Sequence, residues 1–300
     1  MVSPTFPWPA LTVDSWTDTR ETLHMWTQIV GKVRMALSPH VNHWWGTTLY
    51  VDARGLTTGL MPVDDGGLEI RFDFIAHELI LQHTDGRARS IQLGPRSVAD
   101  FYRDVRADLD ALGVHVQIYP VPVELPEVIP FADDETHHSY DPQAVHTFWQ
   151  QLVVITEVFS EFRARFTGKV SPSHFFWGAF DLAVTRFSGR AAPQHPGGVP
   201  NCPDSVMHEA YDSELSSAGF WCGGGEEGAF YSYAYPEPDG FRSTPITVSG
   251  ARYDEQLGEF ILPYETARTS SNPAATVLDF LEQTYRAAAD TGGWPAGLAE

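Results

Sequence analysis

Cysteine is scarce in this 300-residue chain, which contains only Cys202 and Cys222. Two thiols cannot build the framework of several disulfides on which small secreted domains depend, and a reducing compartment would keep both as thiols. The segment Met1-Val2-Ser3-Pro4 also lacks the basic start and apolar core of a signal peptide. The sequence therefore predicts a cytoplasmic protein.

Basic residues are few as well. The chain has 19 Lys and Arg against 39 Asp and Glu, which gives a formal net charge of −20. Binding to nucleic acid or to an anionic membrane needs a concentrated basic surface. No apolar run approaches the length of a membrane span. We expect a small-molecule ligand, with neither nucleic acid nor a membrane as a partner.

Short signatures of well-known catalytic sites are also missing. The chain contains no Gly-x-Ser-x-Gly elbow, no His-Glu-x-x-His helix, no Cys-x-x-Cys pair and no glycine-rich phosphate loop that ends in Gly-Lys. Nucleophilic catalysis by serine or cysteine and nucleotide binding are therefore minor options. A specific reaction does not follow from the sequence.

What the chain does contain is an internal repeat. The apolar residues of one helical face recur 129 positions later (152 − 23), first as Leu23, Trp26, Val30, Val33 and Leu37 and then as Leu152, Ile155, Phe159, Phe162 and Phe166. Residues 78–81 recur as residues 259–262 at an offset of 181 (259 − 78). The repeat predicts an α+β fold made of two copies of a helix, antiparallel sheet, helix unit, related by a pseudo-two-fold axis.

Three segments follow from this repeat. We expect a first unit with an N-terminal arm at residues 1–119, a proline-rich acidic linker at 120–141 and a second unit at 142–300. Helices are predicted at 18–37, 95–113, 142–166 and 273–290. Strands are predicted at 47–53, 56–62, 68–75, 79–82, 179–185, 230–235, 246–248 and 258–263.

The offset between the two copies increases by about fifty residues only once, which places an insertion at residues 190–226. This segment is rich in histidine, glycine and aromatic residues and contains both cysteines. A long insertion in a compact domain is usually functional or disordered, and the aromatic content argues against disorder. We expect it to fold over the second unit as a lid.

The leading hypothesis is an enzyme that acts on a small anionic molecule in a pocket of the second unit, beneath this insertion. His174 or His195 would move protons, and Glu209 would assist. Arg186 and Arg190 would hold the acidic group. Further substrate contacts are predicted from Phe176, Trp177, Asp181 and Trp221.

Metal chemistry is an alternative for the same residues. His174, His195 and His208 are the candidate ligands, because imidazole nitrogens bind divalent transition metals. Their spacing matches no established metal motif. The expected cofactor is therefore either none or a divalent transition metal.

Two other functions remain open. The rival to the enzyme is a non-catalytic small-molecule binder or scaffold, in which the aromatic residues serve recognition alone. In a structural interpretation, the insertion caps a sheet edge or forms a dimer contact, and Arg54 and Arg186 pair with acidic residues. The sequence assigns no oligomeric state.

The stretch from His174 to His195, together with residues 43–58 and 258–264, resembles an uncharacterised bacterial domain-of-unknown-function family, family 5996. The resemblance covers nearly the whole chain. It implies that the 190–226 segment belongs to the normal design of these proteins. It brings no activity, cofactor or catalytic residue with it.

Overall fold

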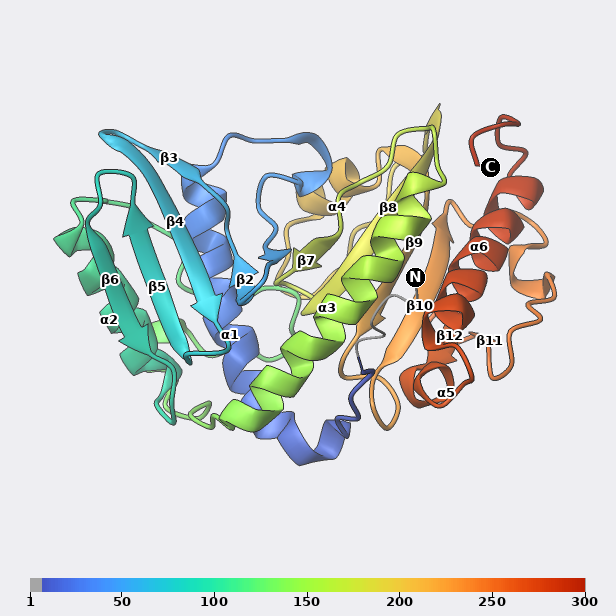
Figure 1. Cartoon of the computed structure of the whole chain (residues 1–300). Coiled ribbons are helices and arrows are strands. Elements are labelled where there is room, and N and C mark those ends of the chain that lie inside the picture. The colour runs from blue at the N-terminus through green and yellow to red at the C-terminus, as the bar shows by residue number, and fades with distance from the viewer. Residues whose placement is uncertain (1–6, 300) are drawn as a thin grey trace.

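The computed structural model describes residues 7–299, and the first six residues of the expected N-terminal arm lie outside this range. The described chain has an α+β fold with six α-helices and two antiparallel sheets of six strands each. Figure 1 shows the two sheets side by side, with one long helix of the second unit crossing between them. The predicted fold class is thus confirmed.

The first unit begins with a long helix, continues with one sheet and ends with a shorter helix. Its elements are α1 (Val13–Leu37), β1 (Tyr50–Val51), β2 (Gly55–Thr57), β3 (Met61–Val63), β4 (Gly66–Asp73), β5 (Glu78–His83), β6 (Ala88–Gln92) and α2 (Val98–Ala111). The strand order is β1-β2-β4-β5-β6, and β3 pairs with β4. A 3-10 turn, η1 (Asn42–Trp44), follows α1.

The second unit has the same general plan with more elements. These are α3 (Pro142–Ala164), β7 (His174–Phe176), β8 (Asp181–Ala191), α4 (Asp204–Ala210), β9 (Ser213–Trp221), β10 (Ala229–Tyr235), β11 (Arg252–Asp254), β12 (Glu259–Pro263), α5 (Tyr264–Arg268) and α6 (Pro273–Thr291). The strand order is β11-β12-β10-β9-β8-β7. Two further 3-10 turns are η2 (Phe131–Asp133), between the units, and η3 (Phe241–Ser243).

Local sequence explains where the helices of the second unit begin. Asp141 precedes α3, and its carboxylate accepts hydrogen bonds from the amides of Gln143 (2.8 Å) and Ala144 (3.2 Å). Proline occupies the first position of both α3 and α6, where its missing amide proton costs nothing. Both helix starts coincide with the predicted ones, at residues 142 and 273.

The middle of helix α1 is enclosed by the rest of the protein. Residues 25–34 are all buried, a run of nearly three turns, so the helix is covered on every side. Figure 1 shows it running behind the first sheet. Any polar side chain in this stretch is therefore forced into the protein interior or into an internal cavity.

The hairpins β4–β5 and β11–β12 pair with the same register. Asp73 lies opposite Glu78, and Asp254 lies opposite Glu259. Their places in the sheets differ, because β4 is an interior strand whereas β11 is an edge strand. The internal duplication and its pseudo-two-fold axis therefore stay predictions.

The segment 190–226 needs correction, because it is not a lid throughout. Residues 213–221 form β9, which pairs with β8 on one side and with β10 on the other, in the interior of the second sheet. Only the stretch around α4 covers the sheet. Strand β9 was missed because Ser216, Ser217, Ala218 and Gly219 carry little of the branched and aromatic character that marks strands.

The two units are joined by specific contacts. Leu49 and Phe175 exchange backbone hydrogen bonds of 3.0 and 2.9 Å. The indole of Trp177 donates to the Thr47 carbonyl (2.8 Å), and its ring lies directly on Gly31, where a Cβ atom would collide with it. Glycine at this point of α1 allows the second unit to pack closely against the first.

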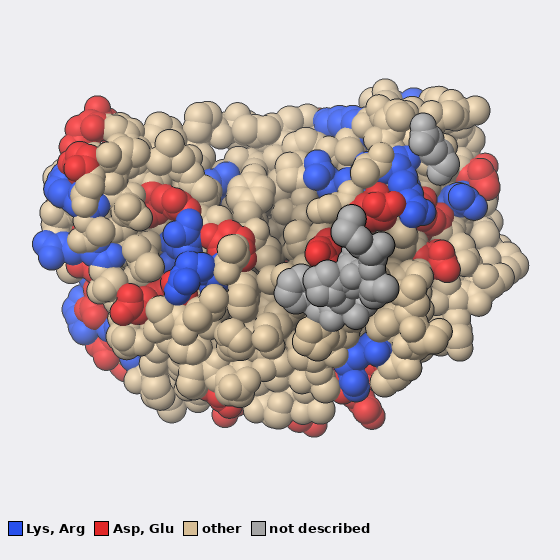
Figure 2. Space-filling view, viewed as in Figure 1, with Lys and Arg blue, Asp and Glu red and all other residues tan. Residues whose placement is uncertain are grey.

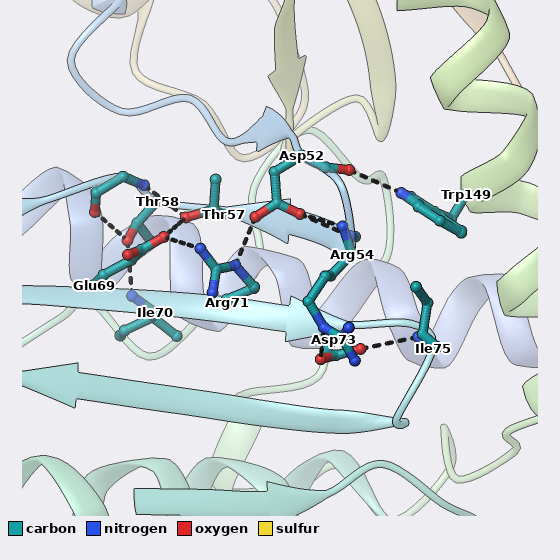
Figure 3. Close-up of polar contacts among 12 residues, drawn as sticks. Asp52, Arg54, Thr57, Thr58, Glu69, Ile70, Arg71, Asp73, Ile75 and Trp149 are labelled. Atoms are coloured by element: carbon teal, nitrogen blue, oxygen red, sulfur yellow. Dashed lines mark hydrogen bonds and ion pairs between the residues drawn. The ribbon is translucent and has the colours of Figure 1, made fainter. Parts of the chain in front are cut away.

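Figure 3 shows a polar network in the first sheet. The Arg54 guanidinium donates to the Asp73 carboxylate, and Arg71 donates to Asp52 (2.6 Å). Trp149 of α3 donates to the Asp52 carbonyl (3.1 Å). Arg54 thus makes the structural pairing with an acidic residue that was one interpretation of the sequence.

The face drawn in Figure 2 carries basic and acidic side chains close together, without a large patch of either sign. Among residues 7–299, no helix combines the length and the apolar character needed to cross a membrane.

Candidate functional site

A cavity of about 490 Å³ lies between the two units. Its floor is one face of the second sheet, formed by β8, β9 and β10. Helix α4 covers it, and α1, η1 and the segment around residues 119–124 form its remaining walls. This volume is in the range of small-molecule sites.

The alternation of side chains along β8 decides which residues reach this cavity. Asp181, Ala183, Thr185 and Phe187 line it, whereas the intervening residues point to the opposite face of the sheet. Arg186 is one of these, and its guanidinium binds the carboxylate of Glu282 on α6 at 3.2 Å. The predicted role of Arg186 in holding a substrate is therefore wrong, because the side chain is fully buried on the helix side.

Asp181 is the most unusual residue of the cavity. It is buried, and the Tyr231 hydroxyl donates a hydrogen bond to its Oδ2. Its other oxygen, Oδ1, has no hydrogen-bond partner among the residues that the structure describes. Removal from water raises the pKa of the carboxyl to about 7, although the bond from Tyr231 opposes this rise.

Gly219 makes the contact between Tyr231 and Asp181 possible. Tyr231 lies on β10 and Asp181 on β8, and β9 runs between them with Gly219 directly opposite Tyr231. A Cβ atom at position 219 would collide with the tyrosine hydroxyl. The missing side chain therefore opens a path for Tyr231 across the middle strand.

A row of hydroxyl groups crosses the same floor beside this contact. Thr185 and Ser217 are hydrogen-bonded at 2.9 Å, and the hydroxyls of Tyr233 and Tyr211 are hydrogen-bonded at 2.8 Å. Burial raises the pKa of Tyr211 to about 12 and the pKa values of Tyr231 and Tyr233 well above the usual range. These tyrosines stay protonated at neutral pH. Tyr231 uses its proton for Asp181, and one of Tyr211 and Tyr233 uses its proton for the other, so that one hydroxyl of this pair can still donate a hydrogen bond to a ligand.

Lys32 and Glu124 stand on the wall opposite the sheet. Lys32 projects from the buried part of α1, and its side chain is packed between the rings of Tyr119 and Trp177. Glu124 has a backbone φ of 62°, and its carboxylate lies on Gly178, where a Cβ atom would displace it. A glutamate in this left-handed conformation is uncommon and indicates that the chain is held in place there.

The charges of these two groups affect each other. Burial lowers the pKa of the Lys32 ammonium to about 8, and the charge of Glu124 partly opposes this effect. The surrounding protein raises the pKa of the Glu124 carboxyl, and Lys32 opposes that rise in turn. Glu124 is an exposed residue that lines the cavity. The pKa values of both groups are thus shifted towards neutrality from their ordinary values.

The stretch around α4 that covers the cavity, called the lid below, forms hydrogen bonds with the first unit and with the segment between the units. His43 donates from Nδ1 to the Ala210 carbonyl (3.3 Å), and Trp44 donates to the Val206 carbonyl (3.1 Å). The amide of Glu124 donates to the Pro200 carbonyl at 2.9 Å. Helix α4 is therefore held over the cavity from two sides.

The structure does not bring together the predicted catalytic residues His174, His195 and Glu209. None of the three lines the cavity. His174 is buried behind the lining residues Trp45 and Phe176, and burial lowers its pKa to about 3. Its ring is therefore neutral and makes no hydrogen bond with the described residues.

His195 and Glu209 lie on the lid and serve its structure. The ring of His195 packs on Tyr211 at 4.6 Å, and its Nδ1 accepts a hydrogen bond from the Gly197 amide at 3.0 Å. Glu209 forms an ion pair with His40 at 2.7 Å that lacks hydrogen-bond geometry. Neither side chain is placed to act on a molecule in the cavity.

The predicted metal ligands do not converge either. His208 contacts the side-chain amide of Gln194, at 3.1 Å from Nδ1. In residues 7–299, the three-residue group whose ligand atoms do come together is elsewhere, at Asp65, His83 and Asp85 in the first sheet. There the guanidinium of Arg87 pairs with both aspartates, at 3.0 and 2.6 Å, and so already neutralises the acidic charge.

Of the remaining residues predicted to contact the substrate, some line the cavity and some do not. Arg190 pairs with Glu214 at 2.6 Å and donates to carbonyls just after α6, and Trp221 is 44% exposed, so neither lines the cavity. Phe176, Trp177 and Asp181 do line it. Aromatic residues next to glycine were a useful signal for the wall.

Lys32, Glu124 and the tyrosines of the floor were missed by sequence reasoning. The alternation of Tyr231, Tyr233 and Tyr235 along one predicted strand was a usable signal, because it places three hydroxyl-bearing rings on one face. No comparable signal marks Glu124, which was assigned to a linker.

Comparison with known proteins now adds one result. The model of a family of unknown function, DUF5996, matches residues 8–300. The chain belongs to this family. No curated protein and no solved structure matches the chain. The family has no assigned function, so the match carries no substrate, cofactor or reaction with it.

Proposed function

We propose that this DUF5996 protein is an enzyme that acts on a small, largely apolar molecule in the cavity between its two units, with Asp181 as the group that transfers a proton. The observation that carries the proposal is the environment of Asp181. This carboxyl is buried at the cavity floor, is held by Tyr231 through one oxygen and keeps the other oxygen without a partner in residues 7–299.

The protonation of Asp181 suits this role. A general acid or base works best when its pKa is near the working pH, because both forms are then present. Burial raises the pKa of Asp181 to about 7. A buried carboxyl with such a pKa that faces a cavity is a common property of catalytic sites.

The walls of the cavity indicate the character of the substrate. Trp44, Trp45, Trp177 and Phe187 provide flat apolar surfaces, and the hydroxyl groups of the floor provide hydrogen bonds. Neither Arg186 nor Arg190, which were predicted to hold an acidic group of the substrate, lines the cavity. Lys32 is the cationic side chain that lines the cavity, so any anionic group would have to lie there.

The ring opening of 5-nitrobenzisoxazole tests the proposal without knowledge of the natural substrate. A base removes the ring C–H proton, the C–H electrons form the nitrile, and the N–O bond breaks to release a coloured phenolate. This small aromatic probe fits the cavity's apolar character. We expect wild-type protein to accelerate the reaction, with a rate that rises with pH and levels off above about pH 7, and Asp181→Asn to lower the rate on the order of 10²-fold.

Glu259→Gln is the matched control. Burial raises the pKa of the Glu259 carboxyl to about 7 as well, but Glu259 does not line the cavity. This variant should keep the wild-type plateau rate, while its pH profile moves to lower pH, because the charge of Glu259 contributes to the raised pKa of Asp181. An Asp181→Asn protein that folds and opens the probe as fast as wild type would contradict the proposal.

Binding without catalysis is the second candidate, and the predominance of aromatic side chains in the walls supports it. A pure binder would quench its own tryptophan fluorescence on addition of 5-nitrobenzisoxazole and release no phenolate. Recording fluorescence and phenolate release on the same sample therefore separates the two functions.

A further inference from the structure

The chain contains two lysines, Lys32 and Lys169, beside 17 arginines (19 − 2). Both lysines are found at the cavity. Lys32 lines it directly, and Lys169 donates to Nε2 of His43 (2.6 Å), a residue of the cavity wall. A chain that uses arginine for almost all its positive charge has thus kept lysine at one site.

The setting of Lys32 is not that of a structural cation. Its side chain is 2% exposed, yet the ammonium group makes no hydrogen bond and no ion pair with the described residues. Its nitrogen lies 5.6 Å from the centre of the Tyr119 ring and 5.7 Å from that of Trp177. A buried lysine usually has a direct acidic partner, because an isolated charge is expensive to remove from water.

We propose that Lys32 is a nucleophile that captures the carbonyl group of an aldehyde or ketone as an imine, so that the cavity takes apolar carbonyl compounds. This inference deepens the proposed function, on which it rests for the identity of the cavity as the substrate site. It names a substrate class and a second reacting residue.

The chemistry of the step matches the groups that are present. Neutral amine attacks the carbonyl carbon, a C–N bond forms, and the carbonyl π electrons move to oxygen, which takes a proton. That proton comes from nitrogen, so that a neutral carbinolamine forms. The hydroxyl then takes a second proton and leaves as water while the nitrogen lone pair forms the C=N bond. The protonated imine that results becomes the neutral imine when it loses its remaining N–H proton. Glu124, which stands near Lys32 and can hold a proton, is the group that would donate to the departing hydroxyl and recover the proton from nitrogen.

Desolvation helps the amine to react. A lysine in an apolar pocket loses its proton more readily, and burial lowers the pKa of Lys32 to about 8. The protonated imine would in turn acidify the adjacent C–H bond of the bound molecule. Asp181 is then the group in the same cavity that would accept this proton.

The other nucleophiles near the cavity fit less well. Lys169 is exposed and already bonded to His43, so its amine has no desolvated environment. Burial raises the pKa of the Cys202 thiol to about 11, which keeps it in its unreactive form. Lys32 is therefore the site that the geometry selects.

Reductive trapping tests the inference on the wild-type protein. Folded full-length chain is incubated with benzaldehyde and sodium cyanoborohydride at neutral pH, so that any imine is reduced to a stable benzyl amine. Peptide mass spectrometry then compares Lys32 with Lys169, which serves as a control within the same chain. We expect Lys32 to be labelled at least about tenfold faster than Lys169, because burial lowers the pKa of Lys32 to about 8 and its amine lines the cavity.

Labelling of Lys32 at or below the rate of Lys169 in the folded protein would overturn the inference. Lys32→Arg keeps the positive charge and should leave Lys169 as the only labelled lysine, and the rate at Lys169 must not change if the variant is folded. The trapping does not depend on opening of 5-nitrobenzisoxazole. If Lys32 is not labelled while the protein still opens the ring, only the proposed role of Lys32 is overturned. If Lys32 is labelled while the ring is not opened, only the proposed role of Asp181 is overturned.

Discussion

At the scale of single residues, the site depends on three glycines as much as on its reactive side chains. Gly219 opens a path for the Tyr231 hydroxyl, Gly178 accommodates the Glu124 carboxylate, and Gly31 receives the Trp177 ring. Each glycine thus permits a close approach between elements that are distant in the sequence. The reactive groups are positioned by these approaches rather than by any local motif.

Replacement of Gly219 by alanine tests this view. The new methyl group would collide with the Tyr231 hydroxyl and lie about 2.6 Å from the Leu182 carbonyl, a backbone atom that cannot move easily. We expect Gly219→Ala to lower the free energy of unfolding by about 1–3 kcal/mol. In 5-nitrobenzisoxazole assays, the folded variant should need a higher pH to reach its plateau, because Tyr231 no longer stabilises the Asp181 carboxylate.

Two comparisons make this result specific. Tyr231→Phe should raise the same midpoint, since it removes the same hydrogen bond. An alanine substitution at Ser216, a small residue of β9 that faces away from the cavity, should leave the midpoint unchanged. An unaltered pH profile in Gly219→Ala would show that the close passage of Tyr231 over β9 is unimportant.

At the scale of elements, strand β8 separates the two functions of the second unit. One face contributes Asp181 and Thr185 to the cavity, and the other contributes Arg186 to the interface with α6. Sequence reasoning placed Asp181 and Arg186 in one site, although five positions (186 − 181), an odd number, separate them along one strand. The two-residue period of a strand, applied to residues 181–187, would have separated them.

Arg186 should accordingly matter for stability alone. Removing one partner of a buried ion pair leaves the other charge without compensation, so we expect Arg186→Met to lower the free energy of unfolding by about 3–5 kcal/mol. The double variant Arg186→Met/Glu282→Gln should recover part of this loss. Urea denaturation of the three proteins measures both effects.

The folded Arg186→Met protein should still open 5-nitrobenzisoxazole at the wild-type rate. A specific loss of turnover in protein that remains folded would place Arg186 in the site after all, against the direction of its side chain in β8.

At the scale of the whole molecule, the cavity belongs to neither unit alone. The floor comes from the second sheet, while Lys32 and His43 come from the first unit and Glu124 comes from the segment between them. The sequence did allow the fold class, most helices and part of the aromatic wall to be predicted, because these follow from periodicity and helix-start signals. The meeting of Lys32, Glu124 and Asp181 depends on how the units pack, which no local pattern encodes.

The ionisation of Asp181 also connects the site to the stability of the whole molecule. Its pKa in the folded state is about 7, above the ordinary value of 3.8, so the folded protein holds this proton more tightly than the unfolded chain does. Stability from this group is complete below about pH 4 and is lost as the pH rises towards 7. Above that range both states are ionised and the contribution no longer changes.

The most direct test of the account is the free energy of unfolding of wild type minus that of Asp181→Asn, measured by urea denaturation across this range of pH. The subtraction removes the contribution of Glu259, whose carboxyl titrates in the same range. We predict that the difference falls by up to about 4 kcal/mol between pH 4 and pH 7 and is flat above. A difference that stays constant, or that rises with pH, would contradict the assignment of Asp181 as the buried proton-transfer group of the cavity.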